Sequence, residues 1–321
     1  MPIMKKPEDF NYTFGPVPSR RLGRSLGVDI IPFKTCTFDC VYCQLGPTSK
    51  KVDARASYVS PKEVVQEVLR KLKICATPDY ITFAGSGEPT IESGLGEIIA
   101  WIKSETDLPV AILTNGSLLW REDVRKACAF ADLVIPSLDA GDQETFELIN
   151  RPCTGVSLQE VVEGVIGFRK MYIGEMWLEV MLLKEINDDE SHVRKIAEIA
   201  RRIEPERVQL NTVVRPPAET TAQAVAVKRL NEYCSLFNVP TEVIAPPAST
   251  EGMFSTECGE NDIIDMLRRR PCTLGDISEG LNVHRNEIVK YIEILKAKGA
   301  VATSERAGKT FYMPVEQGQE F

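Results

Sequence analysis

The sequence has little histidine, no long hydrophobic run and no excess of basic residues. His192 and His284 are the only two histidines among 321 residues. No apolar run approaches the roughly 20 residues that a membrane span requires, and residues 1–10 lack the apolar block of a secretory signal. The formal net charge of −8 argues against binding nucleic acid through bulk electrostatics. We therefore expect no membrane partner.

Disulfide pairs are the next feature that the sequence does not suggest. It has nine cysteines but no secretory signal, which favours the cytoplasm, where thiols stay free for metal binding or catalysis. Six of the nine show no C-x2-C or C-x3-C spacing and are expected to be small buried apolar residues: Cys75, Cys128, Cys153, Cys234, Cys258 and Cys272.

The other three, Cys36, Cys40 and Cys43, form the pattern C-x3-C-x2-C within residues 33–43. A closed iron–sulfur or structural zinc site uses four ligands, whereas an iron–sulfur cube held by three thiolates leaves one iron open to a small molecule. The alternative is a zinc site closed by a fourth ligand elsewhere in the chain. Neither His192 nor His284 is an obvious fourth ligand.

This spacing, with Tyr42 directly before the last cysteine, resembles the cluster loop of the radical S-adenosylmethionine (radical SAM) superfamily. The resemblance implies a [4Fe-4S] cluster on the three cysteines, with S-adenosylmethionine (SAM) chelated at the open iron and Tyr42 beside it. It implies reductive cleavage of SAM to methionine and a 5'-deoxyadenosyl radical, which abstracts hydrogen from a substrate. A reduced ferredoxin or flavodoxin would supply the electron. The protein positions and shields these reactive groups.

A second motif, F-A-G-S-G-E-P-T at residues 83–90, follows the cysteines by about 40 residues. It resembles the G-x-G-E-P variant of the superfamily's Gly-Gly-Glu motif. The resemblance implies that the backbone at Gly85 and Gly87 and the carboxylate of Glu88 receive the methionine amino group of SAM. Glycines there would let a ligand approach the backbone closely. The alternative is a tight turn after a strand.

Three more residues follow expected strands. Thr114 lies in an L-T-N-G segment that resembles the third-strand T-N-G of members such as the molybdenum-cofactor cyclase, and Ser137 lies in a segment that resembles that group's fourth-strand S-L-D, whose serine contacts the cofactor. The alternatives are a strand-ending turn for Thr114 and a helix cap for Ser137 and Asp139. Lys184 is placed to meet a carboxylate or a phosphate; its alternative is solvation. No catalytic acid or base is assigned.

Short apolar runs alternate with helical patterns along most of the chain. Six strand–helix units predict a parallel, right-handedly wound sheet. Six units are fewer than the eight of a closed TIM barrel and resemble the superfamily's open partial barrel. We therefore expect an α/β fold, a partial (β/α)6 TIM-type barrel at 15–245 after an extension at 1–14. The expected strands are 26–31, 80–84, 109–113, 133–136, 177–183 and 207–211, with a further short strand at 242–245. The expected helices include 121–130, 142–150, 157–171, 188–203 and 222–237.

The segment before the cluster loop, residues 14–29, reads F-G-P-V-P-S-R-R-L-G-R-S-L-G-V-D. It resembles a prokaryotic group of radical SAM proteins related to the wybutosine-synthesis tRNA enzyme, although this sequence has no second three-cysteine set and no flavodoxin-like domain. Residues 15–25 are expected to form a loop. Its Arg20, Arg21 and Arg24 would either clamp a phosphate or an acidic patch, or be solvated.

After a linker at 246–258, residues 259–321 are expected to form three helices and a hairpin. This order resembles a winged helix-turn-helix, a DNA-binding module in many proteins. Residues 256–321, however, hold nine Lys and Arg against eleven Asp and Glu, a net charge of −2. A DNA reader presents a basic stripe. We therefore favour a docking or substrate-presenting role for this winged-helix-like domain over DNA binding.

The predicted function is a radical SAM enzyme whose substrate is unknown. A laterally open barrel with an attached recognition-type domain suggests a macromolecule, RNA or protein. The alternative is an iron–sulfur transcription regulator that binds DNA through the winged-helix domain. The predicted metal ligands are Cys36, Cys40 and Cys43, and the predicted cofactor-binding residues are Tyr42, Gly85, Gly87, Glu88, Thr114, Ser137 and Lys184.

Overall fold

A mostly parallel eight-stranded sheet forms the centre of the protein. The computed structural model describes residues 10–244, 259–281, 283, 285–306 and 308–315. The sheet order is β1-β2-β5-β6-β7-β8-β9-β10, in which β1 pairs antiparallel with β2 and every other pair is parallel. The strands are β1 (Thr13–Ser19), β2 (Gly23–Val28), β5 (Tyr80–Phe83), β6 (Val110–Thr114), β7 (Leu133–Pro136), β8 (Glu175–Leu182), β9 (Arg207–Thr212) and β10 (Thr241–Val243). The predicted α/β fold is confirmed.

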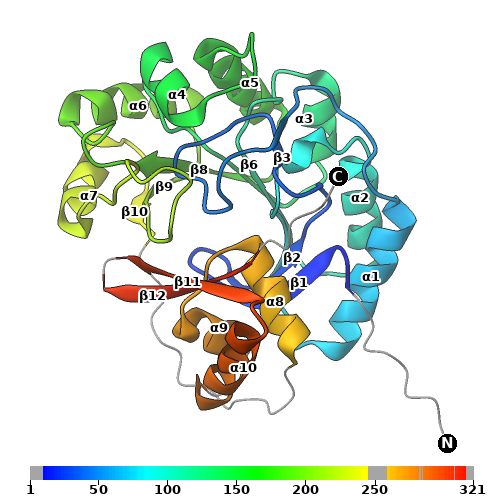
Figure 1. Cartoon of the computed structure of the whole chain (residues 1–321). Coiled ribbons are helices and arrows are strands. Elements are labelled where there is room, and N and C mark those ends of the chain that lie inside the picture. Colours follow the sequence, from blue (N-terminus) through cyan, green and yellow to red (C-terminus); the bar gives the residue numbers. More distant parts are fainter. Residues whose placement is uncertain (1–9, 245–258, 282, 284, 307, 316–321) are drawn as a thin grey trace, which may run out of the picture.

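Helices cover the outer face of this sheet (Figure 1). The expected helices at 121–130, 142–150, 157–171 and 188–203 begin within two residues of the predicted positions, and Ser157 caps α5 by accepting from the Glu160 N–H at 3.2 Å. Helix α1 has Pro61 at its first position and buries Val64, Val65 and Val68. The predicted helix at 222–237 is shorter, because its regular part begins at Val227. The helices are α1 (Pro61–Ile74), α2 (Leu95–Glu105), α3 (Glu122–Cys128), α4 (Gln143–Asn150), α5 (Leu158–Met171), α6 (Glu190–Ile203) and α7 (Val227–Tyr233), with 3-10 turns η1 (Pro89–Ile91) and η2 (Cys234–Leu236).

The inner face of the sheet carries a different set of side chains. On β8, Leu178 and Val180 pack in the main core under the helices, and Trp177 belongs to a second cluster with Leu133 and Leu22. Glu179 alternates with the core residues in the same way, so it projects to the inner side. Within the described residues no hydrogen-bonded ladder joins β10 back to β1, so the sheet is open.

The segment 15–25, expected to be a loop, is instead an antiparallel hairpin of β1 and β2. Glycine and proline led to the wrong prediction. Pro16 and Pro18 both lie in β1, which is an edge strand, where a missing backbone N–H need not break the ladder. The register shifts between Phe14 and Val17, as in a bulge. The hairpin turn carries Arg20 and its neighbours toward the inner face of the sheet.

The C-terminal residues form a second, smaller group with the predicted order of three helices and a hairpin. Its core contains Ile263, Leu267 and Ile288, and Val17 of β1 is part of the same cluster, so the group packs on the edge of the sheet (Figure 1). The elements are α8 (Glu260–Arg269), α9 (Leu274–Leu281), α10 (Arg285–Ala297), β11 (Val301–Arg306) and β12 (Lys309–Pro314). The predicted linker at 246–258 and most of the predicted extension at 1–14 lie outside the described residues. None of the described helices is long and apolar enough to span a bilayer.

Candidate cofactor site

The three predicted metal ligands lie in one loop at the carboxyl end of β2. The loop includes the short strands β3 (Thr35–Cys36) and β4 (Lys50–Lys51), which pair with each other. Its backbone is fastened to the end of α4, because the Val41 N–H donates to the Ile149 carbonyl at 2.9 Å, and a turn brings the Cys43 N–H to the Cys40 carbonyl at 3.0 Å. Burial is the main cause that raises the pKa of Cys40, and the neighbouring Cys36 and Cys43 add to it.

Two asparagines donate to the sulfur atoms. The Asn115 side-chain amide is 3.6 Å from Cys36 Sγ, and the Asn150 amide is 3.5 Å from Cys40 Sγ. Burial raises the pKa of Cys36 to about 12 and raises those of Cys40 and Cys43, so these groups are neutral thiols without a ligand. A bound metal deprotonates a coordinating thiol, and amide donors then stabilise the thiolate. The donors therefore suit a metal-bound state.

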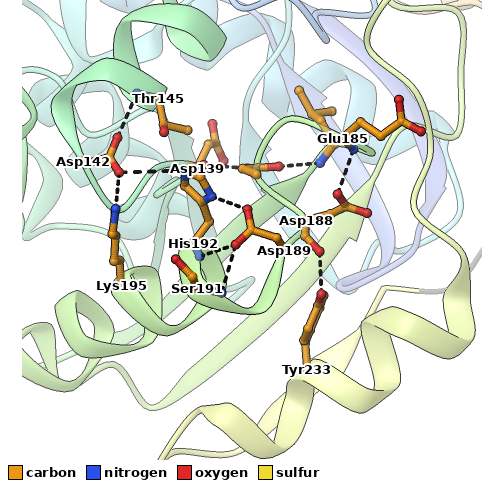
Figure 2. Close-up of polar contacts among 12 residues, drawn as sticks. Asp139, Asp142, Thr145, Glu185, Asp188, Asp189, Ser191, His192, Lys195 and Tyr233 are labelled. Carbon is orange, nitrogen blue, oxygen red and sulfur yellow. Dashed lines mark hydrogen bonds and ion pairs between the residues drawn. The ribbon is translucent and has the colours of Figure 1, made fainter.

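The arrangement suits a cluster better than a single zinc ion. Nowhere in the described part of the chain do three or more His, Cys, Asp or Glu side chains converge on one point as ligands of a single ion. A zinc site requires convergence, whereas the thiolates of an iron–sulfur cube each bind a different iron. On α6, His192 Nδ1 is hydrogen-bonded to the Asp189 carboxylate, and its Nε2 lies 3.8 Å from Asp142 (Figure 2). His284 lies outside the described residues.

The turn after β5 connects two of the predicted motifs. The Oε1 atom of Glu88 accepts hydrogen bonds from the Thr90 N–H, the Thr90 hydroxyl and, at 2.6 Å, the Thr114 hydroxyl. Its Oε2 atom accepts from the Asn115 N–H at 2.7 Å. Burial raises the pKa of Glu88, and these four hydrogen bonds oppose the effect. A carboxylate oxygen with one donor retains room for a second, so Oε2 is the atom of Glu88 that can accept from a ligand.

The two glycines of this turn are required by neighbouring protein atoms. A Cβ on Gly87 would lie 1.9 Å from the Thr35 carbonyl oxygen, and a Cβ on Gly85 would lie 2.4 Å from the Asp29 carboxyl carbon. Gly85 also has φ = +152°, which a side chain disfavours. Asp29 accepts hydrogen bonds from the Ser86 N–H and hydroxyl. The predicted reason for the glycines, close approach of a ligand, is therefore not needed to explain them.

Asp139 holds the cluster loop against the end of β7. Its carboxylate accepts from the Tyr42 hydroxyl at 2.5 Å, the Asn150 amide at 2.8 Å and the Met181 N–H at 3.0 Å. Burial raises the pKa of Asp139 to about 6, against these hydrogen bonds. Tyr42 thus points into the fold and braces the loop, and Asn150 joins Asp139 to Cys40.

Helix capping does not explain the S-L-D segment. The cap of α4 is Asp142, whose side chain accepts from the Thr145 N–H at 3.0 Å (Figure 2). Ser137 is half-buried beside Thr114, to whose carbonyl its N–H donates at 3.0 Å. The Ser137 hydroxyl makes no hydrogen bond to any residue that the structure describes, which leaves it available to a ligand.

Lys184 and the three hairpin arginines are placed very differently from one another. The Lys184 side chain is 50% exposed and pairs with Glu185 at 3.3 Å, so the predicted alternative of a solvated lysine fits this position. Arg24 is exposed. Arg21 makes two hydrogen bonds to Glu179, of 2.7 and 2.8 Å, and Arg20 donates to Asn211 Oδ1 at 3.0 Å.

Sequence reasoning missed several of the residues that build this site. Asn115 lies inside the T-N-G segment and Asn150 is the last residue of α4, but nothing in the sequence showed that their amides reach the sulfur atoms. Glu179 and Asn211 looked like ordinary polar residues of alternating strands. Their pairing with the hairpin arginines depends on a contact over more than 150 residues of sequence.

Comparison with known proteins identifies relatives over most of the chain. The family described as "Radical SAM superfamily" matches residues 30–209. The UPF0026 protein MJ1312 of Methanocaldococcus jannaschii is 37% identical over 311 residues, which is 94% of this chain and 95% of that protein. A crystal structure of a radical SAM methyltransferase from Sphaerobacter thermophilus is similar in fold, with a TM-score of 0.53 and 18% identity over 68% of this chain and 65% of that one.

One relative carries a different kind of name. "GTPase Obg" of Brachyspira hyodysenteriae is 42% identical over 291 residues, which is 90% of this chain but 43% of that protein. The chain therefore spans less than half of that relative. A GTPase phosphate loop has the pattern G-x4-G-K-[ST]. This chain contains G-K-T only at 308–310, without the first glycine, where the hairpin turns into β12. The name is therefore no guide to this chain.

Proposed function

The chain belongs to the radical SAM superfamily and is a homologue of the UPF0026 proteins, and from this we propose that it cleaves SAM reductively at a [4Fe-4S] cluster. The observation that carries the proposal is the cysteine loop. Its three thiols lie in one loop, no three His, Cys, Asp or Glu side chains among the described residues converge as ligands of a single ion, and two of the thiols receive an amide N–H. When bound, the cluster and SAM supply a 5'-deoxyadenosyl radical that abstracts hydrogen from the substrate.

The residues of the candidate cofactor site have different roles in this proposal. Cys36, Cys40 and Cys43 hold the cluster. Glu88 offers Oε2 to the ammonium of SAM, and the Ser137 hydroxyl offers a further polar contact. The remaining cofactor-site residues act by position: Tyr42 braces the loop, Thr114 fixes Glu88, and Gly85 and Gly87 allow the turn to pack on Asp29 and Thr35.

The proposal also covers the fold, the subgroup of the superfamily, the electron donor and the compartment. We describe the sheet and outer helices as a partial (β/α)6 barrel, and the hairpin segment at 14–29 supports a place near the wybutosine-related group. Reduced ferredoxin or flavodoxin would be the electron donor. Eight cysteines are free in the structure, in keeping with the reducing cytoplasm. A macromolecular substrate, RNA or protein, stays a prediction.

The C-terminal group is proposed as a winged-helix-like docking domain. The three helices and hairpin have the expected order. The lysines of α10 and the residue after it are neutralised: Lys290 pairs with Glu287 at 2.6 Å, and Lys298 pairs with Glu260 at 2.6 Å. A helix that reads DNA needs exposed, unpaired positive charge. A DNA-binding regulator is therefore not favoured.

The test is anaerobic reconstitution with iron and sulfide, followed by EPR of the reduced protein with and without SAM. We expect a [4Fe-4S]+ signal whose shape changes when SAM is added, together with 5'-deoxyadenosine under strong reduction. A cluster signal that ignores SAM would contradict the proposal, and zinc without sulfide would return the cysteines to a structural role.

A further inference from the structure

The inner face of the sheet holds a group of arginines from three distant segments. Arg20 lies in the β1–β2 turn, Arg215 follows β9, and Arg270 follows α8. Burial lowers the pKa of Arg20 to about 10, and the charges of Arg215, Arg21 and Arg270 lower it further against the attraction of Glu179. Burial also lowers the pKa of Arg215, and Arg270 adds to that effect. The contacts agree with this grouping: Arg20 donates to Asn211 of β9, and Arg215, just after β9, lies 3.5 Å from Asp276 of α9, the helix that follows Arg270.

These arginines are incompletely paired. Arg21 occupies both carboxylate oxygens of Glu179. Arg20 has only the neutral Asn211 amide oxygen as a hydrogen-bond acceptor within the described chain. Arg215, whose side chain is 10% exposed, lies 3.5 Å from Asp276 Oδ1.

Individual arginine nitrogen atoms also lack hydrogen-bond acceptors within the residues that the structure describes. The buried Nε of Arg215 has no hydrogen-bond partner among the described residues. No ion pair of Arg270 occurs in that part of the chain either. Four guanidinium groups thus meet the carboxylates of Glu179 and Asp276, which leaves two positive charges in excess.

An excess of buried positive charge is unfavourable unless an anion neutralises it. A phosphate monoester carries −1.5 to −2 charges at pH 7 and three acceptor oxygens. Arginine forks match that geometry with paired hydrogen bonds. A phosphate group would therefore balance the charge and supply the acceptor that the Arg215 Nε lacks.

The arginines adjoin the cofactor site through β8. Glu179, the partner of Arg21, stands beside Ser137 in the parallel ladder, and its carbonyl accepts from the Leu138 N–H at 2.8 Å. A group bound by the arginines would thus lie on the inner face next to the S-L-D segment.

The C-terminal group completes this surface. It contributes Arg270 and Asp276, and Arg269 lies 3.8 Å from the carboxylate of Asp29, which holds the G-S-G-E-P turn. Arg306, at the end of β11 in the C-terminal hairpin, also donates to the Ala222 carbonyl at 2.7 Å. These contacts hold the C-terminal group against the sheet. Arg20 and Arg215 belong to the sheet part of this surface, and Arg270 belongs to the C-terminal group.

We propose that Arg20, Arg215 and Arg270 form a binding site for a phosphate group of the substrate. The inference rests on the proposed function, since it places the substrate on the inner face beside the SAM site. It assigns the C-terminal group a direct part in substrate binding. The substrate class is a phosphorylated molecule with its phosphate held by the arginines and its reacting carbon nearer to the S-L-D segment.

The experiment measures binding of inorganic phosphate to the reconstituted protein of 321 residues by calorimetry and thermal unfolding, with sodium chloride at matched ionic strength as reference. We expect saturable stabilisation, about 2 °C at a phosphate concentration tenfold above the Kd. Arg20→Gln should weaken phosphate binding at least about tenfold. Arg24→Gln, an exposed arginine of the same hairpin, should bind phosphate as the unaltered protein does.

The unfolding temperature of Arg20→Gln without phosphate shows whether Arg20 serves ligand binding or only the stability of the fold. Without phosphate, Arg20→Gln should unfold at the same or a higher temperature, because one buried excess charge is gone. Stabilisation by phosphate no greater than by chloride would overturn the proposal, as would an Arg20→Gln protein that is less stable without phosphate and binds it undiminished.

The SAM response distinguishes the substrate from the cofactor. Arg20→Gln should keep the EPR change on adding SAM. Loss of that change with phosphate binding intact would assign the arginines to the SAM carboxylate and overturn the proposal. Phosphate binding does not require SAM cleavage, so failure of the proposed chemistry would be seen separately.

Discussion

The cofactor end and the arginine end of the inner face differ in how far the protein satisfies its own polar groups. At the cofactor end, Glu88 receives four hydrogen bonds and Asp139 three, all from the chain itself. At the arginine end, Arg215 keeps a buried N–H without a partner among the described residues. A satisfied network positions neighbouring groups, whereas an unsatisfied one is completed by a ligand.

The largest effect should come from the thiols that the satisfied network positions. Cys40→Ala removes a ligand that the chain cannot replace, so we expect loss of most cluster iron and at least about a hundredfold less 5'-deoxyadenosine. Iron and sulfide analysis and chromatography of the products measure both. Cys75→Ala, at the end of α1, should keep the cluster. Full iron content in Cys40→Ala would show that this end is not the metal site.

Glu179 connects the two ends, and its loss should be the largest effect on stability. Glu179→Gln leaves Arg21 buried without its carboxylate, so we expect the free energy of unfolding to fall by about 3–5 kcal/mol at pH 7. Denaturant titration measures it. Glu242→Gln, at an Arg–Glu pair that is nearly half exposed, should cost at most about 1 kcal/mol. Equal losses of unfolding free energy in Glu179→Gln and Glu242→Gln would contradict the claim that the buried pair matters more than the exposed one.

The same variant has a defined pH dependence. Burial would raise the pKa of Glu179, but Arg21 outweighs it and holds the pKa below its ordinary value. Since the folded pKa is lowered, the stabilisation is present above the ordinary carboxyl pKa of about 4.3 and is lost as pH falls through the lowered value. The gap in unfolding free energy between unaltered protein and Glu179→Gln should therefore narrow below about pH 4. A gap that widens there would contradict this pairing.

A smaller effect should follow from weakening one hydrogen bond at the cofactor end. Asn115→Ala removes the donor to Cys36 Sγ. This hydrogen bond is stronger to the reduced, more negative cluster, so we expect the midpoint potential to fall by about 50 mV, which is about 1 kcal/mol for one electron. Redox titration followed by EPR measures it. Ser117→Ala is the control, because Ser117 bonds to Thr37 at 2.7 Å in the same network without touching sulfur.

Lys184 should give the smallest effect of all. Its ion pair with Glu185 is solvent-exposed, so Lys184→Ala should change the unfolding free energy by less than about 0.5 kcal/mol and leave the SAM-dependent EPR change intact. Weaker SAM binding in this variant would restore Lys184 to the cofactor site and show that the cofactor end extends beyond the satisfied network.

Local patterns predicted the α/β fold well, and the three cysteines lie in one loop as their spacing indicates, while their role as metal ligands stays a prediction. The C-x3-C-x2-C spacing, the capping residues and the alternating apolar runs each act over a few residues, so the sequence carries them directly. The hairpin at β1 was missed because prolines are usual in loops, and only its edge position in the sheet makes Pro16 and Pro18 acceptable in a strand.

Tertiary contacts are what the sequence did not reveal. Arg20, Arg21 and Arg24 are equivalent as letters in one segment, but in the fold one lies among other arginines, one is paired with Glu179 and one is exposed. The arginines that join Arg20 come from 215 and 270, at distances along the chain that no local pattern spans. Likewise, the glycine requirement at Gly87 follows from the position of Thr35.

The spread of the arginines along the chain has a consequence for synthesis. A ribosome that has made Glu88 has already made all three thiols, whereas Arg270 follows Arg20 by 250 residues and emerges late. A stop codon between these points would yield a product with the cluster motifs but an incomplete phosphate site. We expect such a fragment, if it accepts a cluster, to lack Arg270 and Asp276 and therefore to hold a phosphate group less tightly than the whole chain.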